Sequence, residues 1–168
     1  VWSDTQAGVV DTLMVLYGPT LESQSDVVYV NDLFDDTTTR NPRISAGDDQ
    51  AFSIVWSDNR SQADLYDVYF ARINTNMEKL FDEDIRVNEP FDDTNVETPD
   101  AASIGDGIVC ICWTDNRQTV RDVYARRFQE NGKAVDARDF IVNPLFEGTN
   151  SVQPRVSGDR EGTAVVVW

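Results

Sequence analysis

The sequence predicts an all-β fold made of three copies of one unit. Four tryptophans, Trp2, Trp56, Trp113 and Trp168, follow one another at intervals of 54, 57 and 55 residues. Between them, short runs rich in Val, Ile, Phe and Tyr alternate with clusters of Gly, Asp, Asn and Pro, which is the pattern of strands and turns. No window has a sustained apolar period of 3.6 residues, so we expect little helix.

Each unit contains the same four blocks in the same order. A W-x-D block comes first, at Val1–Asp4, Val55–Arg60 and Cys112–Arg117. A strand-like D-V-Y block follows, at Asp67–Arg72 and Asp122–Phe128, with Asp11–Val15 as an eroded version. A Val-Asn pair then ends a short strand, at Asn31, Asn88 and Asn143, and a proline follows eleven residues later, at Pro42, Pro99 and Pro154. An apolar run, Ala51–Trp56, Gly107–Trp113 or Gly162–Trp168, leads to the next tryptophan.

A long repeat that holds four short strands is typical of a propeller blade. We therefore predict a β-propeller-like array of three four-stranded units in one repeat domain, residues 1–168, with units of about 2–55, 56–112 and 113–168. The runs Val109–Trp113 and Val165–Trp168 are apolar on both faces, so they should be covered on both sides. The run Asp122–Phe128 mixes charged and apolar residues, so we expect it nearer to solvent.

Three blades are too few to close a propeller ring, because propellers typically have four to eight. The array should therefore stay open unless another chain or further blades complete it. The chain starts at Val1 and stops at Trp168 within a motif. We expect it to be cut from a longer array; the alternatives are that it pairs with a second copy to give six blades, or that it is part of an open β array in a larger assembly.

These motifs resemble the long repeats of secreted bacterial surface and adhesin-like proteins, in which W-x-x-D, V-Y-A-x-R-F, V-N, Q-x-x-P-x-V and V-V-V-W recur. The third copy matches best, through Val123–Phe128, Val142-Asn143, Gln153-Pro154 and Val165–Trp168. The resemblance implies a propeller-like fold and a non-catalytic role outside the cell. Separately, the segment Ser157–Thr163 approaches the S-x-D-x-G-x-T turn of sialidase propellers, with one residue too many.

Composition narrows the possible functions. Thirty acidic residues against fourteen basic ones give a net charge of −16, which argues against nucleic acid and against anionic membranes. The chain has no histidine, so it cannot contain a Ser-His-Asp triad or an imidazole base of its own. Carboxylate chemistry of the glycosidase type stays open. Cys110 and Cys112 are one residue apart in a predicted strand, too poorly directed for a disulfide, so we expect buried free thiols.

Four aspartates beside the W-x-D to D-V-Y loop are the candidate site residues: Asp58, Asp67, Asp115 and Asp122. A residue that returns in every unit favours a structural role, so we expect Asp58 with Arg60, and the equivalent pair Asp115 with Arg117, to join Asp67 and Asp122 in a charged turn network. The alternative is one calcium ion per unit, because oxygen-rich loops suit that cation.

The sequence thus predicts a non-catalytic, extracellular or cell-surface propeller segment that binds a protein or glycan of the cell surface or matrix, or serves a structural role. The alternative is part of a glycan-cleaving, sialidase-like enzyme. The first copy departs from the repeat over Leu16–Ser25, either because it caps the array or because Tyr17 contacts a ligand or subunit.

Overall fold

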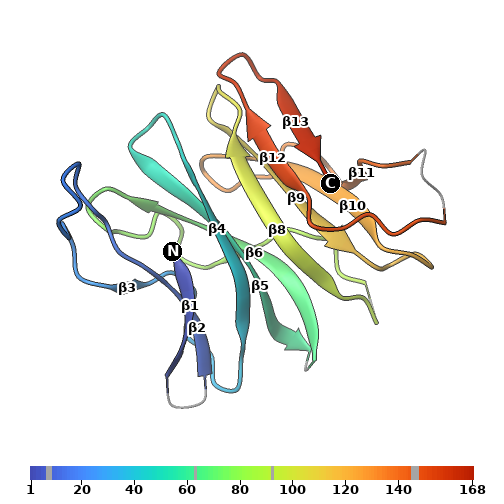
Figure 1. Ribbon diagram of the computed structural model, residues 1–168, viewed down its shortest axis with the longest axis horizontal. Coiled ribbons are helices and arrows are strands. Elements are labelled where there is room, and N and C mark those ends of the chain that lie inside the picture. The colour runs from blue at the N-terminus through green and yellow to red at the C-terminus, as the bar shows by residue number, and fades with distance from the viewer. Residues whose placement is uncertain (7–8, 63, 92, 145–147) are drawn as a thin grey trace.

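A computed structural model describes the chain from Val1 to Trp168, apart from residues 7–8, 63, 92 and 145–147. The described residues contain thirteen β-strands and no helix, as the repeat pattern predicts. The strands form four antiparallel sheets, and each sheet lies beside the next one in chain order (Figure 1). None of the described segments is a helix long and apolar enough to cross a membrane.

Strands follow one another in chain order within every sheet. Sheet 1 contains β1 (Trp2–Gln6), β2 (Val9–Met14) and β3 (Val28–Tyr29). Sheet 2 contains β4 (Thr39–Ala46), β5 (Ala51–Gln62), β6 (Leu65–Asn74) and β7 (Ile85–Arg86). Sheet 3 contains β8 (Val96–Ser103), β9 (Ile108–Asp115), β10 (Asp122–Gln129) and β11 (Phe140–Ile141). Sheet 4 contains β12 (Arg155–Gly158) and β13 (Ala164–Val167).

The four-stranded antiparallel unit that the sequence predicts is therefore present in sheets 2 and 3, and the other described strands form sheets of three and of two. The sequence repeat and the sheets do not share the same boundaries, because Trp56 lies within β5 and Trp113 lies within β9. A segment from one tryptophan to the next thus begins within one sheet and ends within the following one.

Three apolar cores fill the spaces between consecutive sheets. Trp56 and Ile54 of β5 pack with Met14 and Val30 between sheets 1 and 2, whereas Val55 of the same strand packs between sheets 2 and 3. A third core lies between sheets 3 and 4 and includes both cysteines of β9 with Val156. This arrangement explains why the strands β5 and β9 are apolar on both faces.

The two cysteines are buried free thiols, which confirms the prediction. Burial in this apolar core raises the pKa of Cys110 to about 11 and also raises the pKa of Cys112. A thiol that stays protonated is a poor nucleophile, so these cysteines contribute to packing.

Two expectations about burial are wrong. The strand β10 is largely buried, because Tyr124 and Phe128 pack into the core between sheets 2 and 3 and Ala125 packs into the core between sheets 3 and 4. The buried carboxylate of Asp122 accepts a hydrogen bond from the amide of Asn143. The strand β13 is exposed on one face, with Val165 at 59% and Val167 at 58%, because β13 pairs only with β12 and no described element covers its outer face.

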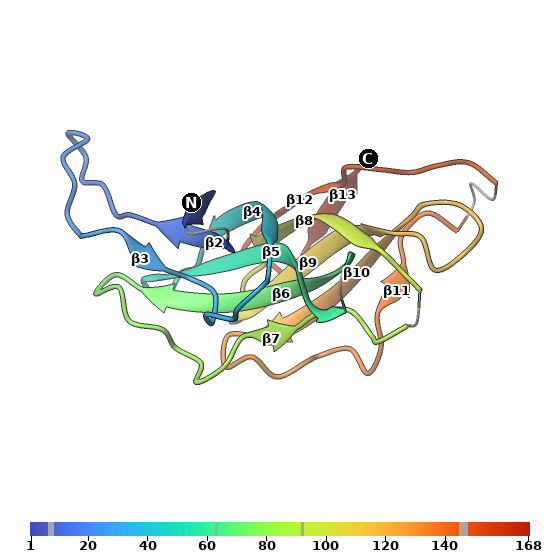
Figure 2. The same ribbon diagram turned by 90° about the horizontal axis from the view of Figure 1, so that it is seen from below.

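The first strands of sheets 2, 3 and 4 lie next to one another. Figure 1 shows β4, β8 and β12 side by side, and Figure 2 shows the last strands β3, β7 and β11 toward the opposite side of the molecule. Polar side chains link these inner strands: Ser103 donates its backbone N–H to Ser45 Oγ at 3.1 Å, and Val156 donates to Asp100 Oδ2 at 2.9 Å. The inner strands β4, β8 and β12 therefore form one continuous surface.

Candidate functional site

Asp58 binds the arginine that follows it in the W-x-D-x-R block. Its carboxylate accepts hydrogen bonds from the Arg60 backbone N–H at 2.8 Å, from Arg60 Nη2 at 2.6 Å and from Trp56 Nε1 at 3.3 Å. The Arg60 guanidinium also pairs with Asp84 at 2.9 Å, and it lies 4.2 Å from the ring centre of Tyr69. Phe34, from the connection after sheet 1, covers the guanidinium at 4.6 Å from its ring centre.

Burial opposes the charge of Arg60, but the hydrogen bonds and ionic contacts with Asp58 and then Asp84 outweigh it and raise the pKa of the guanidinium. Asp84 also accepts a salt bridge from Lys79 and the backbone N–H of Asp32, which lies just after sheet 1. The network therefore ties the connection after one sheet to the body of the next sheet. We call this arrangement, in which an arginine is held by two aspartates and covered by a phenylalanine, the arginine clamp.

The same clamp recurs in sheet 3. Arg117 binds Asp115 and pairs with Asp139 at 2.9 Å, and its guanidinium lies between the rings of Tyr124 and Phe91, 4.1 Å and 4.3 Å from their centres. Burial again opposes the charge and the two carboxylates again raise the pKa of the arginine. Repetition in two sheets indicates that the clamp stabilises the fold.

Asp67 and Asp122 belong to a separate repeated network. Each lies directly opposite Asp58 or Asp115 in the strand register, but its carboxylate accepts a hydrogen bond from the buried asparagine of the Val-Asn pair, Asn88 or Asn143. The side-chain oxygen of the same asparagine accepts a hydrogen bond from the backbone N–H of the residue after the aspartate, Val68 or Val123. In sheet 1, Asn31 makes the same two contacts, with the carboxylate of Asp11 and the backbone N–H of Thr12.

The four predicted site residues therefore divide between two networks, and the structure confirms the pairs Asp58–Arg60 and Asp115–Arg117. Within the described residues, no group of three or more metal-ligating side chains is positioned to hold an ion. The calcium site at these aspartates stays a prediction.

Sequence reasoning missed Asp84 and Asp139, as well as the two phenylalanines that cover the arginines. A signal exists, because both aspartates precede the asparagine of the Val-Asn pair by four residues. Phe34 and Phe91 likewise each follow that asparagine by three residues. The third residue at that position, Phe146, lies outside the described residues.

The inner strands carry a strained bulge at the proline that the sequence singled out. Asn41, Thr98 and Gln153, each just before a proline, have positive φ angles of 52°, 49° and 56°. The register of β4 against β5 and of β8 against β9 shifts at this point. Left-handed backbone at a non-glycine residue costs about 1–3 kcal/mol and is common next to functional sites.

Beside these bulges lies a cluster of polar residues that does not repeat. Arg40 and Glu97 occupy equivalent positions, opposite Ser57 and Thr114, yet they carry opposite charges. Tyr66 precedes Asp67 just as Arg121 precedes Asp122, so this position also differs between the sheets. We define the Glu97 cluster as Arg40, Tyr66, Asn95, Glu97 and Arg121.

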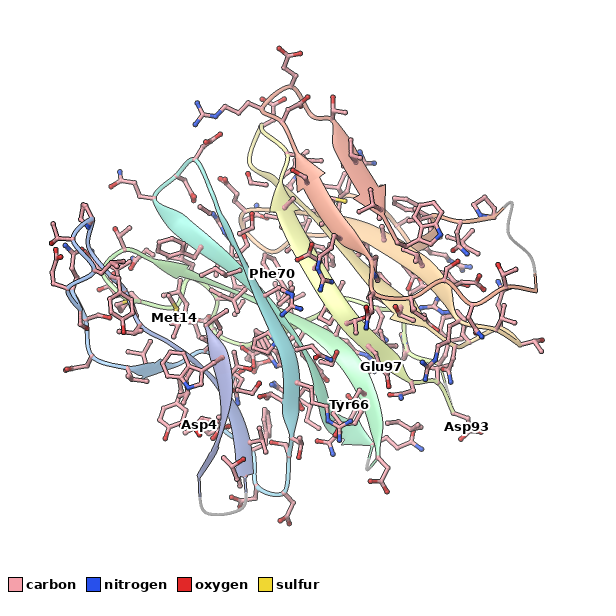
Figure 3. All side chains as sticks on the ribbon, viewed as in Figure 1. Asp4, Met14, Tyr66, Phe70, Asp93 and Glu97 are labelled. Carbon is pink, nitrogen blue, oxygen red and sulfur yellow. The ribbon has the colours of Figure 1, made fainter. Side chains whose placement is uncertain are left out.

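Contacts join the Glu97 cluster across sheets 2 and 3. The Arg40 guanidinium lies 4.1 Å from the Tyr66 ring centre, and the Tyr66 backbone N–H donates to Asn95 Oδ1 at 3.2 Å. Asn95 Nδ2 donates to Glu97 Oε1 at 2.8 Å, while the other oxygen of Glu97 lies 3.9 Å from Arg121. Figure 3 shows Tyr66 and Glu97 toward the end of the molecule where β8 begins. The cluster offers a partly exposed carboxylate, an amide and two guanidinium groups.

No family model matches the chain, and no curated protein matches it either. Among solved structures, a Penicillium chrysogenum α-L-arabinanase in complex with arabinobiose is similar, with a TM-score of 0.57 and 14% sequence identity. The similarity covers 84% of this chain and 45% of the arabinanase chain, so this chain spans less than half of that protein. The likeness supports the β-propeller type of fold.

The comparison corrects one expectation. The sequence predicts a chain without catalysis, but the protein with the similar fold is a glycan-cleaving enzyme, which contradicts that prediction. The alternative that the sequence left open, part of a glycan-cleaving propeller, is better supported.

Proposed function

We propose that this chain is part of a β-propeller that binds and cleaves glycans, and that the Glu97 cluster contacts the sugar. The observation that carries the proposal is the likeness in fold, over 84% of the chain, to an arabinanase that holds arabinobiose. Arabinose-containing glycans are therefore the substrate class to test first.

The chemistry of the Glu97 cluster suits a sugar. A glycan presents many hydroxyl groups, which pair with carboxylate and amide oxygens as acceptors and with guanidinium and amide N–H groups as donors. The side chain of Glu97 is 33% exposed, so its carboxylate can reach a ligand. Arg121 is more exposed still and can change partner without unfolding the sheet.

Hydrolysis of a glycosidic bond uses two carboxyl groups, one of which donates or accepts a proton. Such chemistry needs no histidine, which agrees with the composition of this chain. Glu97 is the carboxylate that we assign to the sugar-binding end. Polymeric glycans occur outside cells, so this function also agrees with the secreted or cell-surface location that the resemblance of the repeats implies.

The test measures binding and cleavage separately. Arabinobiose and arabinan are titrated into the purified chain by calorimetry, and release of reducing sugar is followed in parallel. We expect binding that Glu97→Gln and Arg40→Ala weaken, and cleavage that Glu97→Gln abolishes while the thermal unfolding midpoint is kept. Glu161→Gln, an exposed carboxylate in the turn between β12 and β13, is the matched control and should change neither.

Absence of binding to arabinan and to a panel of other neutral and acidic glycans would refute the proposal. Binding that Glu97→Gln leaves unchanged would refute the assignment of the site.

A further inference from the structure

The buried aspartates of the Asp–Asn pairs differ in their cationic partners. In sheet 2, Arg86 Nη2 donates to Asp67 Oδ1 at 2.6 Å, so this aspartate is neutralised by a guanidinium group. In sheet 3, Asp122 is equally buried, but no arginine or lysine among the described residues forms an ion pair with it, and the neighbouring Arg121 pairs with Glu97 instead. Burial of a carboxylate without a cation costs free energy, so Asp122 is the exception that requires an explanation.

The strand register accounts for this difference. Arg86 lies opposite Tyr69 in the pairing of β7 with β6, and Ile141 lies opposite the equivalent residue Tyr124 in the pairing of β11 with β10. Both residues also precede the asparagine of the Val-Asn pair by two positions. Ile141 therefore occupies the position from which Arg86 reaches its aspartate, and isoleucine supplies no cation.

A pocket lies at this position of sheet 3. Its volume is about 470 Å³, and the described residues that line it include Asp122, Ile141 and Asn143, with Gln118 and Thr119 from the loop between β9 and β10. Pockets of about 300–1,000 Å³ are the usual size for small ligands. The carboxylate of Asp122 is therefore accessible to a ligand that enters this pocket.

Sheet 1 shows the same relation between the missing arginine and a pocket. Tyr29 lies opposite Leu13, which is the position of Arg86 in sheet 2, and a pocket of about 240 Å³ is lined by Asp11 and Tyr29. In both sheets that lack the arginine, a pocket thus lies beside the buried aspartate. The pocket at Asp122 is the larger of the two.

We propose that the pocket at Asp122 binds a guanidinium group of a ligand, such as an arginine side chain. The carboxylate of Asp122 accepts from the guanidinium N–H groups, as Asp67 accepts from Arg86 in sheet 2. The amide oxygen of Gln118 and the hydroxyl of Thr119 are further acceptors at the pocket. The net charge of −16 attracts a cationic ligand to the chain. This inference is independent of the proposed glycan activity.

The test follows the side-chain amide signals of Asn143 in NMR spectra of the ¹⁵N-labelled chain, because Asn143 Nδ2 donates to Asp122 and reports on this pocket. The probes are N-acetyl-arginine amide and its uncharged isostere, N-acetyl-citrulline amide. We expect the arginine probe to shift these signals with a dissociation constant of about 1 mM, as its size allows. The citrulline probe should bind at least about 10-fold more weakly, because it cannot form the charge-assisted hydrogen bonds.

A third probe distinguishes two sources of the guanidinium group. The tripeptide Ala-Arg-Ala, acetylated and amidated, should bind more tightly than the arginine probe if the natural ligand is a protein segment. Equal binding of the two would identify a small molecule as the source.

Asp122→Asn should weaken binding of the arginine probe about 30-fold, the effect of removing one partner of a buried charge pair. Asp67→Asn is the matched control, because it makes the same change at the repeated position that Arg86 already fills, and it should leave binding at Asn143 unchanged. If Asp122→Asn does not fold, Ile141→Arg tests the site with the carboxylate kept. The chain then supplies its own guanidinium, as in sheet 2, and the probe should no longer bind.

The repeat also allows a site to be created. Arg86→Ile gives sheet 2 the residue that sheet 3 has at this position. The arginine probe should then shift the side-chain amide signals of Asn88, which donates to Asp67, although it leaves them unchanged in the parent chain.

Four results would overturn the proposal: no shift of the Asn143 signals with the arginine probe up to about 20 mM, equal binding of the citrulline probe, binding that both Asp122→Asn and Ile141→Arg leave unchanged, or no new site in Arg86→Ile. Displacement of the arginine probe by equimolar calcium would assign the pocket to a metal ion and would also overturn it.

Discussion

Removal of Arg60 tests whether the arginine clamp stabilises the fold. In Arg60→Met, the methionine keeps most of the length of the side chain but leaves Asp58, whose side chain is 1% exposed, without its cationic partner. Loss of one partner of a buried ion pair costs about 3–5 kcal/mol. Because Lys79 still neutralises Asp84, we expect the lower end of this range, about 3 kcal/mol. For a chain of this length, that corresponds to a fall in the unfolding midpoint of about 6–12 °C.

The assay is urea unfolding followed by circular dichroism and tryptophan emission, with both signals fitted to one transition. Arg160→Met is the matched control, because Arg160 pairs with Asp48 on the surface and its side chain is 85% exposed. That control should leave the midpoint unchanged. Asp58→Asn added to Arg60→Met should restore at least half of the lost stability, because the unpaired charge is then removed. A loss below about 1 kcal/mol for Arg60→Met, or no recovery in the double variant, would refute the reasoning.

Three further predictions concern single groups. Asn143→Ala should lower the free energy of unfolding by about 2–3 kcal/mol in the same urea assay, because it leaves the buried carboxylate of Asp122 and the backbone N–H of Val123 without their partner. A loss no larger than that of an exposed Asn→Ala change would contradict this role. The hydrogen bonds of Arg127 lower the pKa of Asp136, so this carboxylate stabilises the fold above the pKa of an unfolded aspartate, and the stabilisation is lost as the pH falls through the lowered folded pKa. Asp136→Asn should therefore flatten the acid side of the profile of unfolding free energy against pH. An unchanged profile would contradict the ion pair. Both cysteine thiols should react with a thiol reagent at pH 8 only after denaturant is added, because burial raises their pKa. Fast reaction of the folded chain would show instead that the core between sheets 3 and 4 opens.

The repeat in the sequence was enough to predict strands, the four-stranded unit and the pairing of Asp58 with Arg60, because all of these are local in the chain. The residues at which one sheet ends and the next begins could not be predicted from the tryptophans alone. Trp56 is conspicuous because it fills the core between two sheets, but that position is the middle of a strand rather than its beginning.

The second carboxylate of the clamp was missed for a related reason. Asp84 lies 24 residues after Arg60 in a short segment that reads as a plain edge strand, and only the fold brings the two together. The burial of β10 was misjudged because a charged residue in a strand normally indicates solvent. Here the partner of Asp122 is an asparagine 21 residues away.

The contrast between repeated and non-repeated residues suggests where this fold can acquire function. The clamp recurs between consecutive sheets, and the Asp–Asn pairs recur within sheets 1, 2 and 3. Arg40 and Glu97, just before the left-handed residues Asn41 and Thr98, lie at equivalent positions in the strand register, and their side chains make the contacts of the Glu97 cluster. They differ in charge without a change in register, so this position accepts different side chains while the sheets keep their structure. A variant that exchanges the two, Arg40→Glu with Glu97→Arg, should therefore retain the unfolding midpoint and change only what the chain binds.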